Sequence, residues 1–100
     1  MVFAAGNNQR DACDVNALSE LQGIWLIGAA DQKGQPLPYS NYGSCVSFYA
    51  PAQFMSTAAQ GAYKPFTGTS AATAYVSGLI ARELASGNKP DMAFIKTFLF

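Results

Sequence analysis

Three short runs of mostly apolar residues mark the first half of the chain. They cover 2–5, 23–29 and 46–49, with glycine, asparagine or proline at or near their ends. The first two do not alternate polar and apolar side chains as a half-exposed strand does. Continuous apolar runs of this length are typical of parallel strands that are covered on both faces. We therefore expect three buried strands, separated by surface loops over 9–22 and 31–42.

The second half of the chain changes to a helical pattern. Residues 69–86 carry apolar side chains on every side, which predicts a long central helix that is buried all round. The glycine in 86–88 is suited to a left-handed helix end. A shorter amphipathic helix is expected to begin at Pro90. Its apolar positions are Met92, Phe94, Ile95, Phe98 and Leu99.

A small hairpin is expected between these two halves, with 54–55 paired to 62–63 around Gln60-Gly61. Strands followed by loops and a central helix predict an α/β layer architecture. Three strands and two helices leave one edge of the sheet open. The apolar start at Met1 resembles a strand that has been cut near its beginning, so we expect an upstream part of the protein to dock at the open edge.

Composition narrows the class of function. Apolar residues make up 50% of the chain and charged residues 12%, which is not the composition of a disordered tail. A formal net charge of zero gives no electrostatic basis for binding nucleic acid or an anionic membrane. No apolar run approaches the roughly 20 residues that span a bilayer, and the N-terminus lacks the basic segment of a signal peptide. We expect neither a nucleic acid nor a membrane as partner.

The two cysteines, Cys13 and Cys45, are too few for a four-ligand zinc site, and the chain has no histidine to complete one. They are either free thiols or a disulfide. The disulfide is the favoured interpretation, and it would imply an oxidising compartment. We expect no metal site.

The candidate chemistry lies in the segment 68–78. Gly68 allows a tight turn, Thr69 can cap the helix, and Ser70 falls at the positive end of the helix. A serine there is accessible to a substrate, and its N–H can donate to an oxyanion. Taken alone, Ser70 is better explained as a helix cap than as a nucleophile. The chain also lacks the histidine that usually takes the proton from a serine nucleophile.

Three motifs in a fixed order complete the picture. They are Phe3-Ala4-Ala5-Gly6-Asn7, then Ser40-Asn41-Tyr42-Gly43 with Tyr49-Ala50-Pro51, then Gly68-Thr69-Ser70-Ala71-Ala72-Thr73. Together they resemble the subtilisin-like serine proteases (subtilases), and within them the proteinase K and aqualysin group. The resemblance covers nearly all 100 residues. It implies the C-terminal portion of a three-layer αβα subtilisin-like fold with a mainly parallel sheet.

By this resemblance, residues 1–100 are a partial peptidase domain, and the N-terminal half with the triad aspartate and histidine would precede them. Ser70 would be the nucleophile, and Asn7 would donate to the oxyanion. The implied substrate-binding positions are Ala4, Ala5, Gly6 and Thr69.

The resemblance also bears on the cysteines and on cofactors. Cys13 and Cys45 match positions that are bridged in aqualysin-like enzymes, which implies a Cys13–Cys45 disulfide. Ser47 stands where proteinase K-like chains often have a calcium-binding aspartate. Without that carboxylate a calcium ion loses its main charged ligand, so we expect no cofactor. A calcium ion in the full-length enzyme stays an open alternative that these residues do not support.

The function implied is that of a secreted serine endopeptidase, which hydrolyses a polypeptide substrate through an acyl-enzyme on Ser70. The alternative is a catalytically incomplete split or degenerate subtilase fragment with a structural or binding role. Because it has no histidine, the chain alone is expected to be inactive. Its expected partner is the N-terminal half of the peptidase domain.

Overall fold

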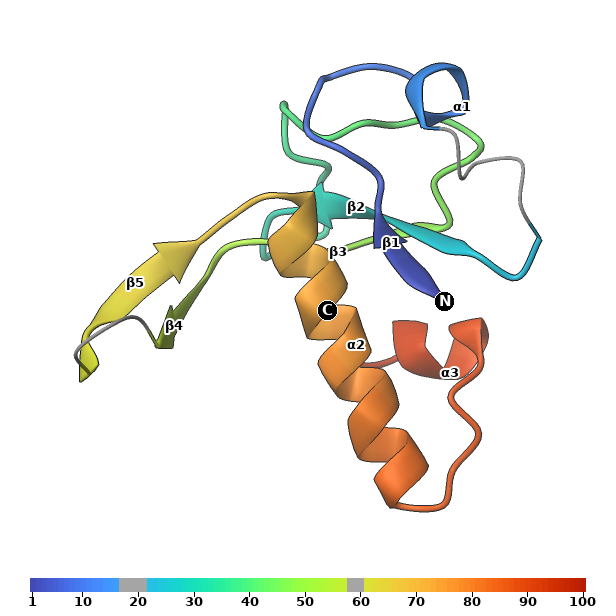
Figure 1. Ribbon diagram of the computed structural model, residues 1–100, viewed down its shortest axis with the longest axis vertical. Coiled ribbons are helices and arrows are strands. Elements are labelled where there is room, and N and C mark those ends of the chain that lie inside the picture. The colour runs from blue at the N-terminus through green and yellow to red at the C-terminus, as the bar shows by residue number, and fades with distance from the viewer. Residues whose placement is uncertain (17–21, 58–60) are drawn as a thin grey trace.

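The computed structural model describes residues 1–16, 22–57 and 61–100. At its centre lies a three-stranded parallel sheet in the order β1-β2-β3 (Figure 1). The strands are β1 (Val2–Ala4), β2 (Trp25–Ala30) and β3 (Phe48–Pro51). All three expected strands are confirmed, and their parallel pairing is the one that continuous apolar runs indicate.

The third strand begins and ends two residues later than the sequence predicts. Ser47 precedes it and contacts β2 through both backbone and side chain: its N–H donates to the Leu26 carbonyl at 2.8 Å, and its Oγ accepts from the Leu26 N–H at 3.1 Å. At the other end β3 includes Pro51, which cannot donate to a ladder. The sheet tolerates this proline because it is the last residue of an edge strand.

Both faces of β2 are covered, because successive side chains of a strand point to opposite sides. Ile27 and Ala29 belong to the larger buried cluster on one face. Leu26 packs on the other face against Ala5 and the single helical turn α1 (Ala12–Val15). The expectation of a loop throughout 9–22 is therefore wrong at α1, while 17–21 lie outside the described residues.

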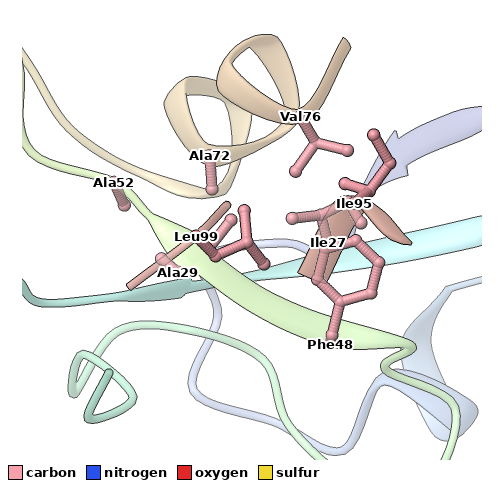
Figure 2. Close-up of a cluster of buried hydrophobic side chains, with 9 residues drawn as sticks. Ile27, Ala29, Phe48, Ala52, Ala72, Val76, Ile95 and Leu99 are labelled. Atoms are coloured by element: carbon pink, nitrogen blue, oxygen red, sulfur yellow. The ribbon is translucent and has the colours of Figure 1, made fainter. Parts of the chain in front are cut away.

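Two helices, α2 (Thr69–Ala85) and α3 (Met92–Lys96), complete the larger cluster (Figure 2). Its buried members are Ile27, Ala29, Phe48, Ala50, Ala52, Ala72, Val76, Ile95 and Leu99. Alanines at the contact allow α2 to lie close to the sheet, and the larger side chains fill the space beside α3. Burying each of the larger side chains contributes roughly 1.5–3 kcal/mol.

Only one face of α2 is buried by the described residues. Thr69, Ala72 and Val76 follow helical spacing along that face. On the other side Tyr75 is 36% exposed and Leu84 is 59% exposed. The prediction of a helix buried all round is thus wrong for this part of the chain, because the sheet and α3 cover one side of α2.

The ends of the two helices show how local chemistry sets their limits. The Asn88 N–H donates to the Glu83 carbonyl at 2.9 Å and the Gly87 N–H to the Leu84 carbonyl at 3.1 Å, which together close the expected left-handed cap of α2. Helix α3 begins at Met92 and not at Pro90, where the sequence predicts its start. Its N-cap is Asp91, whose carboxylate accepts from the Phe94 N–H at 2.8 Å.

The expected hairpin is also present. It pairs β4 (Phe54–Thr57) with β5 (Tyr63–Phe66) in antiparallel register and projects away from the sheet (Figure 1). The expected pairing of 54–55 with 62–63 is wrong, because Phe54 pairs with Phe66 and Met55 with Pro65. Gln60 of the expected turn lies outside the described residues. None of the helices in the described ranges is long and apolar enough to cross a membrane.

Candidate active site

The turn that follows β1 carries the first candidate residue, Asn7. The sheet ends with a bond from the Ala5 N–H to the Ile27 carbonyl at 3.0 Å, and the chain then reverses at Gly6 with φ of 110°. Side chains rarely adopt this conformation, and a Cβ on Gly6 would collide with the side-chain amide of Asn41. The turn therefore needs glycine, and it leaves the Asn7 side chain exposed.

The side chain of Asn7 is held by the start of α2. Its Oδ1 accepts from the Thr69 N–H at 2.9 Å. Because a backbone N–H can only donate, this bond fixes the oxygen as the inner atom of the amide and leaves Nδ2 as the free donor. A Cβ built on Gly68 would lie 3.5 Å from that Nδ2, so the donor nitrogen lies beside the turn into α2.

Ser70 is the second residue of α2, and it is exposed. The first N–H groups of a helix have no acceptor within the helix, and they carry its partial positive charge. Among the described residues no acceptor is paired with the Ser70 N–H, and the first turn holds no acidic side chain. The structure thus brings an exposed hydroxyl, an unpaired backbone donor and the Asn7 amide to one end of α2.

Thr69 occupies a different place from that expected of a cap. The N-cap of α2 is Gly68, which has φ of 109° and no side-chain cap, and Thr69 is the first helical residue. Thr69 is 1% exposed, and its Oγ1 accepts from the Gly6 N–H at 3.2 Å. Its hydroxyl therefore joins the helix to the Asn7 turn, and its role toward a substrate stays a prediction.

The small residues before Asn7 are placed unequally. Ala5 is 1% exposed and packs in the smaller cluster with Ala12 and Leu26. Ala4 and Gly6 are half-buried. Gly6 contacts Thr69 through the bond described above, so the two motifs meet at this point. The specificity pocket expected from Ala4, Ala5 and Gly6 stays a prediction.

The sequence motif 40–43 contains a residue whose contacts sequence reasoning did not assign. Asn41 is 1% exposed, and its Oδ1 accepts from the N–H groups of Asn8 at 2.9 Å and Arg10 at 3.0 Å. Its Nδ2 donates to the Ala5 carbonyl at 2.9 Å. Asn41 therefore binds the backbone on both sides of Asn7. One signal for this residue was present in the sequence, which is that Asn41 stands in the motif 40–43.

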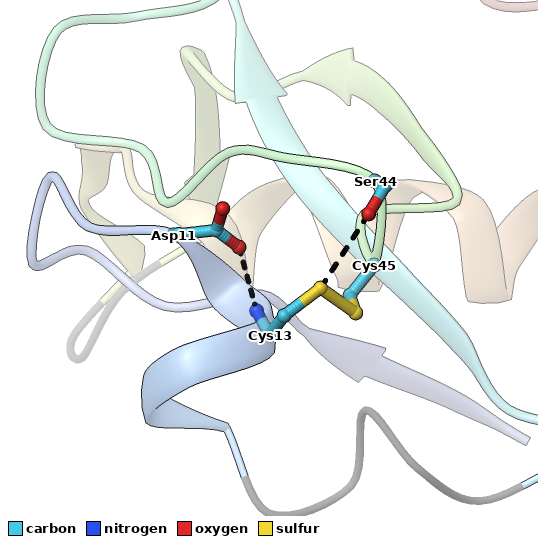
Figure 3. Close-up of a disulfide and its surroundings, with 4 residues drawn as sticks. All are labelled: Asp11, Cys13, Ser44 and Cys45. Carbon is cyan, nitrogen blue, oxygen red and sulfur yellow. Dashed lines mark hydrogen bonds between the residues drawn. A yellow bond between two sulfur atoms is a disulfide. The ribbon is translucent and has the colours of Figure 1, made fainter.

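The two cysteines form the implied disulfide, with 5.3 Å between the Cα atoms of Cys13 and Cys45 (Figure 3). Cys13 lies in α1, where the Asp11 carboxylate caps the turn by accepting from the Cys13 N–H at 2.9 Å. The bridge ties α1 to the segment before β3 across a separation of 32 residues. A loop of this length corresponds to about 3–4 kcal/mol of stabilisation in the chain-entropy model.

Within the described residues, the two ionisable groups with shifted pKa values do not supply a base for Ser70. The chain has no histidine, and the described residues contain no group of three potential metal ligands. A hydrogen bond from Asn88 and the Arg82 guanidinium hold the pKa of Glu83 below its usual range. Glu83 lies in the fourth turn of the same helix, roughly 20 Å from Ser70 at 1.5 Å per residue. A tyrosine is protonated at neutral pH, and burial raises the pKa of Tyr49 further, so that phenol offers no base either.

Comparison with known proteins gives a consistent result. A model of the subtilase family matches residues 1–94. The chain is 37% identical over 99 residues to alkaline serine exoprotease A of Vibrio alginolyticus, which covers 98% of this chain and 18% of that protein. It is 39% identical over 88 residues to proteinase R of Parengyodontium album, with 87% of this chain and 22% of that protein covered. The chain thus spans about a fifth of the length of these relatives.

A solved structure shows the same fold. The crystal structure of a cold adapted subtilisin-like serine proteinase matches with a TM-score of 0.74 at 34% identity. The match covers 92% of this chain and 34% of that one. The expected α/β class, with a parallel sheet from the subtilisin-like fold, is therefore confirmed.

Proposed function

The chain belongs to the subtilase family, and we propose that it carries the nucleophile and the oxyanion hole of a subtilisin-like serine endopeptidase. In this proposal residues 1–100 form part of a peptidase domain. An N-terminal half supplies the triad aspartate and histidine, and that half is the first partner of this chain. The second partner is a polypeptide substrate.

The observation that carries the proposal is the bond from the Thr69 N–H to Asn7 Oδ1. It directs Asn7 Nδ2 outward beside the start of α2, where the Ser70 N–H also has no acceptor among the described residues. Two donors that converge on one point beside a hydroxyl are what acyl transfer requires, because the carbonyl oxygen of the substrate becomes negative in the transition state. Helix α2 adds the partial positive charge of its N-terminus.

The reaction then proceeds in two steps. Ser70 Oγ attacks the scissile carbonyl while the histidine of the N-terminal half takes its proton, and the oxyanion accepts from Asn7 Nδ2 and the Ser70 N–H. The histidine returns the proton to the leaving amine, which leaves an acyl-enzyme on Ser70. Water attacks this ester in the second step and the acid is released. None of these steps needs a cofactor.

The alternative is a catalytically incomplete fragment with a structural or binding role. The observation in its favour is that the 100 residues contain no histidine. Without a general base, Ser70 stays a neutral alcohol, and no acid protonates the leaving amine. On both readings the chain alone is inactive, so the two differ only when the missing half is present.

The test is therefore made on an assembled peptidase domain. The chain is co-expressed with the N-terminal half of the peptidase domain of the Vibrio alginolyticus relative, and the purified assembly is given a chromogenic peptide amide. We expect turnover that is lost in Ser70→Ala, and labelling of Ser70 by a fluorophosphonate. A folded, monodisperse assembly with neither turnover nor labelling would establish the alternative.

We also propose that the protein is secreted. The support is the Cys13–Cys45 disulfide, because such bridges form and persist in oxidising compartments. Intact mass of protein recovered from the culture medium should be about 2 Da below that of the reduced chain. Two alkylatable thiols in that material would contradict the proposal.

A further inference from the structure

We propose that the segment 39–41 acts as a bracket that sets the position of Asn7 relative to Ser70. Tyr39 and Asn41 are then positioning residues for the reaction, although neither touches the reacting atoms. The inference rests on the proposed function, since it concerns the geometry of the same oxyanion hole. It is carried by hydrogen bonds from three consecutive side chains to three different elements.

Tyr39 holds the turn that leads into α2. Its hydroxyl accepts from the Gly68 N–H at 2.8 Å and lies 2.8 Å from Thr67 Oγ1. Gly68 has φ of 109°, a conformation that the surrounding contacts must maintain. The Tyr39 hydroxyl is thus a fixed acceptor for the residue that orients the first turn of α2, two positions before Ser70.

Asn41 holds the opposite side of the site. Besides the three side-chain bonds to Ala5, Asn8 and Arg10, its own N–H donates to the Gly6 carbonyl at 2.8 Å. Four bonds from one buried residue therefore surround Asn7, which itself remains exposed. A buried amide with all these partners satisfied is a rigid attachment, because any movement that left a partner unpaired in the interior would be energetically costly.

Ser40 anchors the bracket to the sheet. Its Oγ accepts from the Ala29 N–H at 3.0 Å and donates to the Asn41 carbonyl at 2.9 Å. Ser40 is 3% exposed, so these bonds lie in the interior. The segment is consequently fixed to β2 while it holds α2 through Tyr39 and the Asn7 turn through Asn41.

This arrangement matters because the two oxyanion donors come from distant parts of the sequence. Asn7 and Thr69 are 62 residues apart and meet directly through one bond. A displacement of about 1 Å in a catalytic group can reduce the rate about a hundredfold. The bracket gives both sides of the site a common reference in the sheet, so a small shift on either side is resisted.

The discriminating variant is Tyr39→Phe, which keeps the ring and removes the acceptor of the Gly68 N–H. Tyr42→Phe is the matched control, because Tyr42 lies in the same loop and is 48% exposed. Both are made in the assembled peptidase domain described above. Four values are measured: kcat, KM, the affinity for a peptide boronate and the affinity for a product peptide. The boronate forms a tetrahedral adduct on the serine, and the product peptide does not.

In Tyr39→Phe we expect kcat and boronate affinity to fall together by about tenfold, with KM and product affinity unchanged. Tyr42→Phe should leave all four values unchanged. Unchanged kcat and boronate affinity in Tyr39→Phe would overturn the bracket. So would an equal loss of affinity for both ligands, because that would indicate a general loss of the fold.

The proposed function can fail separately, and it does so if the unsubstituted assembly neither turns over peptide nor binds the boronate. Amide hydrogen exchange in the same assembly then decides the inference. Exchange that becomes faster in Tyr39→Phe at both Gly68 and Thr69 supports the bracket, because the bond to Asn7 has weakened with it. Faster exchange at Gly68 alone would overturn it.

Discussion

In the proposed site, the oxygen of the Asn7 side-chain amide stabilises the fold and its nitrogen stabilises the oxyanion. Two substitutions at this residue should separate these roles. Asn7 Oδ1 accepts from the Thr69 N–H at the start of α2, while Nδ2 has no acceptor in the described part of the chain. Asn7→Asp keeps an oxygen for Thr69 and loses the donor. Asn7→Ala loses both. The stability of the two variants should therefore differ although their activity does not.

The magnitudes follow from these contacts. Removing one oxyanion donor lowers kcat by about 10²–10³, a range known from subtilisin, which is itself a member of this family. Both variants should show at least this loss. Leaving the Thr69 N–H without its acceptor costs about 1 kcal/mol, as for a lost N-cap. Asn7→Ala should lose that amount, whereas the carboxylate of Asn7→Asp should gain about 0.3–1 kcal/mol from the positive end of α2.

The assay pairs steady-state hydrolysis of a chromogenic peptide with thermal unfolding of the assembled peptidase domain. A loss of 1 kcal/mol corresponds to a fall of about 2–4 °C in Tm for a domain of this size. We expect such a fall for Asn7→Ala and none for Asn7→Asp. Equal melting temperatures in the two variants, or kcat retained in Asn7→Asp, would refute the division of roles.

Further outcomes follow from the rest of the structure. Replacing Cys13 and Cys45 by serine should lower the free energy of unfolding by about 3–4 kcal/mol, measured by urea titration, and no change would contradict the entropic account. Gly68→Ala should cost about 1–3 kcal/mol because φ there is 109°; an unchanged Tm would show that the turn relaxes. The lowered pKa of Glu83 gives stability that is complete above its usual value of 4.5 and is lost as pH falls through the lowered pKa. Glu83→Gln should therefore flatten the acid limb of the stability–pH curve, and an identical limb would oppose this assignment. The chain expressed alone should show no turnover and should bind a hydrophobic dye through the exposed face of α2, whereas a monomer that unfolds cooperatively would contradict this.

Sequence reasoning found the elements of the fold because their signals are local. A continuous apolar run such as 23–29 indicates burial on both faces of a strand. Strand β2 (25–30) lies within this run except for its last residue. Boundaries were less accurate because they depend on pairing. The end of β3 at Pro51 is set by its register with Ala30, which no pattern in 46–49 contains.

The error on α2 has a different cause. Its residues are apolar on all sides, and the sequence cannot say which side the same chain covers. Here the sheet covers the face of Ala72 and Val76, while Tyr75 and Leu84 remain exposed. A helix that is apolar all round but buried on one face indicates a surface for further protein, as expected for part of a larger domain.

For the candidate site, the sequence could indicate only the residues that stand in motifs. Asn7 and Ser70 were chosen as candidates because they stand in recognisable segments, and their catalytic roles stay predictions. The structure brings Asn7 into contact with the start of α2. The contacts of Tyr39 and Asn41 were not predicted, because each makes hydrogen bonds to residues about 30 positions away. Such contacts depend on the tertiary fold, and residue type alone does not predict them.

The bond between Asn7 and Thr69 also makes formation of the site a late event in synthesis. The two residues are 62 positions apart, so at about 5–20 residues per second Thr69 follows Asn7 by roughly 3–12 s. Until α2 has been made and has docked, the Asn7 amide has no partner to orient it. Contacts of such long sequence separation are among the slowest to form in folding. The two proposed oxyanion donors are therefore brought together only when this part of the fold is complete, and a nascent chain that stops before α2 lacks this arrangement.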